Sequence, residues 1–199
     1  MVFDLDGTLL RGRTVCEVLA DALGHGDQMR RFEALNAEAD IAAARAEMAR
    51  WYSAVERPRL LEFLDGAVWA PGAHEGVARL QAAGAKVAIA SITCSFAVER
   101  FAATLGIERI LGTVLGADVV EDHVWPRHKA PWMRALADEQ GVAMSRTAAV
   151  GDSSGDVEML QAARCGVFVG KTSPAEWLGT HMPNADIRDV ADHILQSWR

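Results

Sequence analysis

The sequence predicts an α/β fold in which helices cover both faces of a parallel sheet, with an all-α segment inserted near its start. The first observation is that, from residue 71 onward, short apolar runs alternate with helical patterns, as in repeated strand–helix units. The second is that residues 13–69 contain helical patterns and no convincing strand. We therefore expect a core domain formed by residues 1–12 and 70–199 and an inserted helical domain at residues 13–69.

The chain opens with an apolar run that predicts a first strand, and the helices of the inserted segment follow it. Thr14 can cap the first of these helices, and Pro58 ends or restarts a later one. Apolar spacing places the expected helices at Val15 to Leu23, from near Gln28, at Ile41 to Val55, and at residues 59–66.

The elements of the core alternate along the rest of the chain. Residues 86–91 are almost continuously apolar, as expected of a strand that is buried on both faces of a parallel sheet. The other expected strands lie at residues 110–115, 147–152 and 166–169. One expected helix ends at Gly84, and four others span residues 96–105, 130–139, 156–163 and 189–198. Residues 118–125 predict a small hairpin that turns at Glu121-Asp122-His123.

Composition excludes several classes of protein. The formal net charge is −7 and no cluster of Lys and Arg suggests a surface that follows a phosphate backbone, so we expect no nucleic acid polymer as partner. No apolar run approaches the ~20 residues that span a bilayer, and no signal peptide is visible. Cys16, Cys94 and Cys165 are too few and too scattered for a disulfide framework. We expect a cytoplasmic protein, a monomer or small homo-oligomer, with no membrane partner.

Polar residues stand where the predicted strands end. Asp4 and Asp6 follow the first strand and, being two residues apart, project to the same side of it. Ser91 ends the second strand, Asp152 ends a later one, and Lys129 opens the helix after the predicted hairpin. In open parallel sheets the active site lies beyond the carboxyl ends of the strands, so these side chains are expected to meet there.

The residue types indicate phosphoryl chemistry. Clustered carboxylates without a neighbouring His or Cys suit a hard cation, above all Mg²⁺. Such an ion, together with Lys129 and Ser91, favours an anion rich in oxygen, and a phosphoryl group fits this description. One aspartate of the opening pair can attack phosphorus, and its neighbour can protonate the leaving oxygen and later deprotonate water.

At this point the sequence resembles the haloacid dehalogenase (HAD) superfamily, in its phosphatase branch, with a helical C1-type cap inserted after the first motif. The resemblance implies a Rossmann-like (HAD-type) core. Four motifs carry it in order: Asp4-Leu5-Asp6-Gly7-Thr8, Ser91, Lys129, and Gly151-Asp152-Ser153-Ser154-Gly155-Asp156.

The resemblance also implies a role for each matching residue. Asp4 resembles the nucleophile and Asp6 the general acid/base, and Ser91, Ile92 and Lys129 resemble the residues that hold the phosphate. The implied Mg²⁺ ligands are Asp4, the backbone carbonyl of Asp6, and Asp152, with Asp156 and Thr8 in support.

The layout is nearest to the phosphoserine phosphatase group, with three departures. That group carries a glutamate shortly after the first motif, where this chain has Arg13. Its Ser-Gly-Gly is Ser91-Ile92-Thr93 here, and its cap Phe and Arg have no clear counterpart in residues 41–48. Arg13 is either a solvated loop residue or a specificity residue that selects a second anion on the substrate.

We therefore expect a Mg²⁺-dependent phosphomonoesterase that hydrolyses a small phosphorylated metabolite through an aspartyl-phosphate intermediate. One alternative is a phosphotransferase or phosphomutase that passes the same phosphoryl group to a hydroxyl other than water. A second alternative is a non-catalytic module that senses phosphate, which need not keep the full reactive set of Asp4, Asp6, Lys129 and Asp152.

Overall fold

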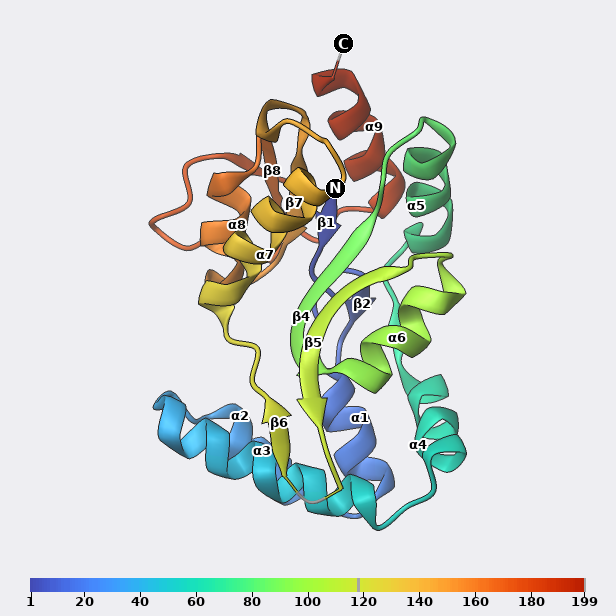
Figure 1. Ribbon diagram of the computed structural model, residues 1–199, viewed down its shortest axis with the longest axis vertical. Coiled ribbons are helices and arrows are strands. Elements are labelled where there is room, and N and C mark those ends of the chain that lie inside the picture. The colour runs from blue at the N-terminus through green and yellow to red at the C-terminus, as the bar shows by residue number, and fades with distance from the viewer. Residues whose placement is uncertain (118, 199) are drawn as a thin grey trace.

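The computed structural model describes residues 1–117 and 119–198, and a seven-stranded sheet forms its centre (Figure 1). The strands lie in the order β6-β5-β4-β1-β7-β8-β9, and all neighbours are parallel except β5 and β6. Their bounds are β1 (Val2–Phe3), β4 (Ala88–Cys94), β5 (Arg109–Leu115), β6 (Val120–Asp122), β7 (Ala148–Gly151), β8 (Cys165–Phe168) and β9 (Thr180–His181). The predicted α/β class with a parallel sheet is confirmed, except that the edge strand β6 is antiparallel to β5.

Helices cover both faces of this sheet because its central strands bury both of their faces. Phe3 of β1 and Ile89 of β4 belong to one apolar cluster, whereas Val2 and Ala88 of the same strands belong to the other. The first cluster packs against α5 (Ala73–Ala82), α6 (Ser95–Thr104) and α9 (Ile187–Ser197). The second packs against α7 (Pro126–Glu139) and α8 (Val157–Ala162), on the other side of β1 in Figure 1.

The remaining helices lie between two short strands, β2 (Leu10–Arg11) and β3 (Val68–Trp69), which pair in antiparallel fashion. They are α1 (Val15–Ala22), α2 (Gly26–Glu33), α3 (Glu38–Ser53) and α4 (Arg57–Phe63), followed by the 3₁₀ turn η1 (Leu64–Gly66). The expectation of no strand in this segment is wrong at its last residues. A two-residue strand is too short to show alternation, and its partner β2 is far away in the sequence.

Three predicted elements differ from those observed. β4 runs to Cys94, past the predicted end at Ser91, with a register shift after Ala90. The hairpin predicted at residues 118–125 is wrong, because Val120–Asp122 pairs back onto β5 rather than forward; Asp118 itself lies outside the described residues. Helix α7 begins at Pro126, a favourable first helical residue, so that Lys129 lies inside its first turn.

Short elements complete the chain. The 3₁₀ turns η2 (Met144–Arg146) and η3 (Ser154–Asp156) precede β7 and α8 respectively. The edge strand β9 was not predicted, since two residues give no periodic pattern. None of the helices in the described ranges combines the length and apolar character needed to cross a bilayer.

Candidate active site

A cavity of about 460 Å³ lies between the carboxyl ends of the central strands and the helices α1 to α3. Its sheet side carries Asp4 and Asp152, which directly follow β1 and β7, Ser91, which lies within β4, and Lys129 from α7. The opposite side carries Glu33 at the end of α2 and Arg45 on α3. The wall between them is mostly apolar and includes Met29, Phe32, Leu35, Ile41, Ala44 and Met48.

One buried ammonium lies among three carboxylates. Lys129 Nζ donates hydrogen bonds to Asp4 Oδ1 and Asp156 Oδ1, both at 2.6 Å, and all three residues are buried. Burial and the neighbouring carboxylates of Asp156 and Asp152 raise the pKa of Asp4 well above its ordinary value, although Lys129 opposes the shift. Three carboxyl groups thus share one ammonium, and the raised pKa means that ionised Asp4 is unfavourable here unless a further cation binds.

Asp156 supports the loop after β7. Its Oδ2 atom accepts from the backbone N–H groups of Asp152 (3.2 Å) and Ser153 (3.1 Å) and from the Ser153 hydroxyl (2.9 Å). Because its other oxygen accepts from Lys129, both of its carboxylate oxygens already have donors. The supporting role that the sequence implied for Asp156 stays a prediction, and the structure shows that Asp156 joins the loop after β7 to Lys129.

The remaining oxygens suit a hard cation. Asp4, Asp152 and Asp156 each place a carboxylate oxygen within 4.8 Å of the others. Asp152 Oδ1 accepts from the Thr8 hydroxyl at 3.1 Å, whereas the Oδ2 atoms of Asp4 and Asp152 receive no hydrogen bond from the described residues. Burial and then Asp156 raise the pKa of Asp152 to about 6. Oxygen donors with excess negative charge fit Mg²⁺.

Gly7 makes room for this arrangement. Its φ is +79°, a left-handed conformation that glycine adopts without strain. A Cβ at this position would lie 2.0 Å from Asp152 Oδ2. The Asp-Gly of the first motif therefore allows the loop after β1 to approach Asp152 closely.

Asp6 has a different environment from Asp4. Its Oδ1 atom accepts from the backbone N–H of Val15, the first residue of α1, at 2.7 Å. Burial raises the pKa of Asp6 to about 7, and Glu33 contributes to the rise. Thus the two aspartates of one motif differ in their surroundings: Asp4 contacts Lys129, and Asp6 contacts the start of α1.

The segment after β4 brings the other predicted phosphate holders to the same cavity. Ser91 is buried, and its hydroxyl accepts from the backbone N–H of Thr93 at 3.2 Å. Ile92 lines the cavity, and its carbonyl accepts from the Thr113 hydroxyl (2.8 Å) and from Arg45 Nη2 (3.2 Å). Ser91, Ile92 and Lys129 therefore meet as the sequence placed them.

Arg13 is not brought to the cavity. Its Nη1 atom pairs with Asp21 at 2.6 Å, and its side chain is 53% exposed. Glu33, at the mouth of the cavity, takes the hydrogen bond of the Thr14 hydroxyl at 3.2 Å. The structure thus gives Arg13 the position of a solvated loop residue.

Sequence reasoning missed Glu33 and Arg45. A signal for Arg45 was present, because it lies four residues after Ile41 and three before Met48, on the apolar face of its helix. An arginine at 8% exposure on such a face calls for a partner or a function. Glu33 gave no comparable signal, since charged residues are common at helix ends.

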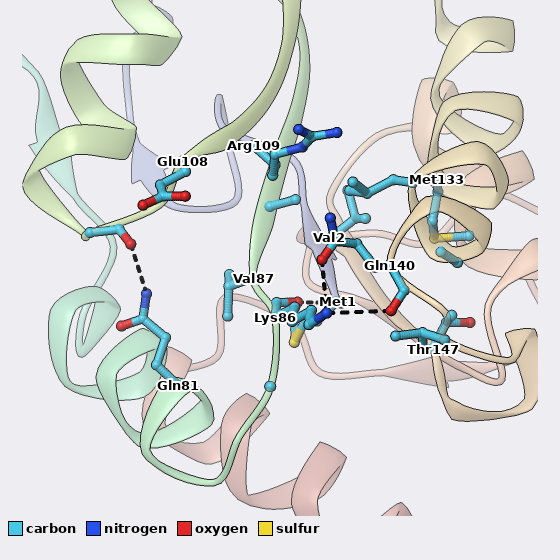
Figure 2. Close-up of a pocket in the computed structure, with 16 residues that line it drawn as sticks. Met1, Val2, Gln81, Lys86, Val87, Glu108, Arg109, Met133, Gln140 and Thr147 are labelled. Carbon is cyan, nitrogen blue, oxygen red and sulfur yellow. Dashed lines mark hydrogen bonds between the residues drawn. The ribbon is translucent and has the colours of Figure 1, made fainter.

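A second cavity, of about 400 Å³, lies at the amino ends of the strands (Figure 2). Two hydrogen bonds join residues that line it: the Met1 ammonium donates to the Lys86 carbonyl at 2.7 Å, and Lys86 Nζ donates to the Gln140 side chain at 2.8 Å. None of the predicted site residues lines it, whereas Asp4, Asp6, Ser91, Ile92, Lys129 and Asp152 all line the first cavity.

Comparison with known proteins points to one family. The family model of haloacid dehalogenase-like hydrolases matches residues 1–161. A phosphoserine phosphatase from Idiomarina loihiensis is 28% identical over 84% of this chain and 80% of its own length. One from Mycobacterium tuberculosis is 27% identical over 98% of this chain but only 47% of its own, so the chain spans about half of that relative.

The fold has solved counterparts. A structure of a phospho-aspartyl intermediate analogue of phosphoserine phosphatase superposes with a TM-score of 0.76, covering 96% of both chains at 17% identity. At that identity the likeness concerns the fold.

Proposed function

The chain belongs to the haloacid dehalogenase-like hydrolase family, and on this premise we propose that it is a Mg²⁺-dependent phosphomonoesterase acting on a small phosphorylated metabolite. The observation that carries the proposal is the meeting of Asp4, Lys129 and Asp152 in one cavity, with Asp6 held separately beside them. This arrangement provides a nucleophile, a cationic holder and a proton donor around one position.

In the first step, a carboxylate oxygen of Asp4 forms a bond to phosphorus while the bond from phosphorus to the leaving oxygen breaks. Asp6 gives its proton to that oxygen, so the leaving group departs as an alcohol. A pKa of about 7 lets Asp6 hold this proton near neutral pH. Lys129, Ser91 and the backbone at Ile92 hold the phosphoryl oxygens.

In the second step, water attacks phosphorus of the aspartyl-phosphate. The Asp6 carboxylate takes a proton from that water, and the bond between phosphorus and Asp4 breaks. Inorganic phosphate is released and both aspartates return to their starting states. The products are one alcohol and one phosphate for each ester and water consumed.

Mg²⁺, held by Asp4, Asp152 and the backbone carbonyl of Asp6, would supply positive charge that offsets the charge of the phosphoryl group. Asp156 and Thr8 hold the liganding side of the site in place, Asp156 through the loop amides and Thr8 through Asp152. We assign residues 13–69 as a cap that covers the cavity and excludes water from the phosphoryl group.

The leaving group contacts the helical side of the cavity. Glu33 at the mouth supports a group that carries a positive charge, rather than the second anion that Arg13 would have selected. The relatives named above are phosphoserine phosphatases, so phosphoserine is the first ester to test. The apolar wall formed by Met29, Phe32 and Ile41 supports larger esters as the next candidates.

The decisive experiment is Asp4→Asn. Hydrolysis of an aryl phosphate should be abolished while the far-ultraviolet circular dichroism spectrum and Tm stay close to those of the wild type, because the change is isosteric. The matched control is Asp27→Asn, whose side chain is 88% exposed on α2. Near-normal turnover by Asp4→Asn would refute the mechanism. In a separate experiment with the wild type, phosphoryl transfer to an added alcohol in place of phosphate release would indicate a phosphotransferase.

A further inference from the structure

Arg45 is a buried cation without a counter-ion. At 8% exposure it lies within 4 Å of no carboxylate oxygen in the part of the chain that the structure describes. Its guanidinium instead meets uncharged groups: Nη2 donates to the Ile92 carbonyl at 3.2 Å, Nη1 lies 3.3 Å from His123 Nδ1, and Cζ lies 4.5 Å from the Trp125 ring centre. Burial of a charge in this way is unfavourable unless other contacts offset it.

The partners of Arg45 belong to the two segments that hold the phosphate. Ile92 follows Ser91, and its carbonyl also accepts from the Thr113 hydroxyl of β5 at 2.8 Å. Trp125 immediately precedes α7, which carries Lys129 in its first turn. One side chain on α3 therefore touches both segments at once.

Further contacts tie these segments together. The Thr113 hydroxyl accepts from the Val124 backbone N–H at 3.2 Å, so β5 joins the Ile92 carbonyl to the chain just before α7. The His123 and Trp125 rings stack with centres 5.3 Å apart. Helix α3 packs against β6, which leads into this segment, as Figure 1 also shows.

We propose that Arg45 is a positioning residue: by holding the Ile92 carbonyl and the Trp125 ring together, it sets the spacing between Ser91–Ile92 and Lys129 when α3 is seated on them. This inference deepens the proposed phosphatase function and rests on it for the identity of the bound anion. Since the fork of a guanidinium can bond and stack simultaneously, lysine cannot replace it here.

The first test needs no activity. Hydrogen–deuterium exchange of Arg45→Met should rise in peptides covering residues 90–95 and 122–129 and stay unchanged in β7 and β8. Arg59→Met is the matched control, because Arg59 also stacks on an aromatic ring, Phe63, and pairs with Glu62, but on α4 away from the cavity. Unchanged exchange in both peptides, or a rise throughout the sheet, would overturn the proposal.

The second test uses inorganic phosphate, which has no leaving group, titrated calorimetrically in the presence of Mg²⁺. Arg45→Met and Arg45→Lys should both bind phosphate roughly tenfold or more weakly than the wild type, as expected when a hydrogen bond from a charged group is lost. Thr113→Val removes the other donor to the Ile92 carbonyl. The double variant Arg45→Met with Thr113→Val should lose less than the product of the two single effects, because both side chains hold one carbonyl.

Kinetics separate positioning from recognition of the leaving group. Arg45→Met should lower kcat/KM by one common factor for two esters whose leaving groups differ in charge. Normal phosphate affinity with a raised KM for only one ester would show that Arg45 reads the leaving group instead. If the wild type hydrolyses no ester, the proposed function fails, while the exchange experiment still decides whether Arg45 holds these two segments.

Discussion

Asp4 and Asp6 show how much the surroundings of a residue decide. They are two residues apart in one motif, yet Asp4 faces an ammonium and Asp6 faces a helix N-terminus. Burial raises the pKa of both aspartates, that of Asp6 to about 7, so their different roles in the proposed mechanism rest on their contacts, with Lys129 for Asp4 and with the start of α1 for Asp6. Tertiary contacts therefore give the two aspartates of the opening motif different surroundings.

The raised pKa of Asp6 predicts a dependence of stability on pH. A folded pKa of about 7, against 3.8 for the free side chain, means that the folded state binds this proton more tightly than the unfolded state. The stabilisation by protonated Asp6 is complete below about pH 4 and is lost as pH rises through 7. Asp6→Asn, which keeps the hydrogen bond from Val15, should thus raise Tm at pH 8 but hardly at pH 4.

We expect a gain at pH 8 on the order of 1–2 kcal/mol, since Asp6 is partly open to solvent. Thermal unfolding in chelator at several pH values measures it, with Asp27→Asn as the exposed control. A gain that is independent of pH would contradict the assignment of the titrating group to Asp6.

At the scale of elements, the turn after β1 depends on Gly7. Gly7→Ala should destabilise the fold by more than the ~1–2 kcal/mol that a left-handed alanine costs, because its Cβ would overlap Asp152. Gly84→Ala is the matched control, since Gly84 has φ +83° and no atom within 4 Å of an added Cβ. Tm values of both variants, and their Mg²⁺ titrations, provide the comparison.

The two glycine variants should differ in a second way. Gly7→Ala displaces Asp152 and should weaken Mg²⁺ binding, whereas Gly84→Ala should leave it unchanged. Equal Tm losses with equal metal affinities would show that the close approach of Gly7 to Asp152 has no bearing on the site.

At the scale of the whole molecule, excess negative charge at one edge of the sheet links folding to metal binding. A ligand that binds only the folded state stabilises it by ~2.7 kcal/mol at a hundredfold excess over Kd. Mg²⁺ should therefore raise Tm, and EDTA should reverse the rise and abolish turnover. Asp152→Asn should lose this shift, and Asp192→Asn, a change in an exposed ion pair with Arg79, should keep it.

Salt alone provides the remaining control for this experiment. Potassium chloride at the same ionic strength as the Mg²⁺ solution should leave Tm nearly unchanged. It screens all exposed charges alike and therefore does not act specifically on the carboxylates of the site. Full activity in chelator would remove the metal from the mechanism.

The sequence by itself determined the family and the residues that gather at the carboxyl edge of the sheet. Four motifs in order predicted the HAD superfamily, and the match of its model to residues 1–161 confirms that prediction. Strand ends in a parallel sheet converge, so Asp4, Ser91 and Asp152 had to meet wherever their strands became neighbours. Local patterns were sufficient for these residues because Asp4 and Asp152 follow buried strands with clear apolar runs, and Ser91 lies within another.

Only the tertiary structure decided which groups lie across the cavity from Asp4, Ser91 and Asp152. The two-residue strands β2 and β3, the return of β6 onto β5, and the rotation of Arg13 toward Asp21 depend on contacts between distant segments, which no local period records. Arg45 and Glu33 reach the cavity because α2 and α3 lie across the sheet edge. Helix orientation is set by packing, and this is why the residues at the strand ends could be predicted from the sequence, whereas Glu33 and Arg45 on the helical side of the cavity could not.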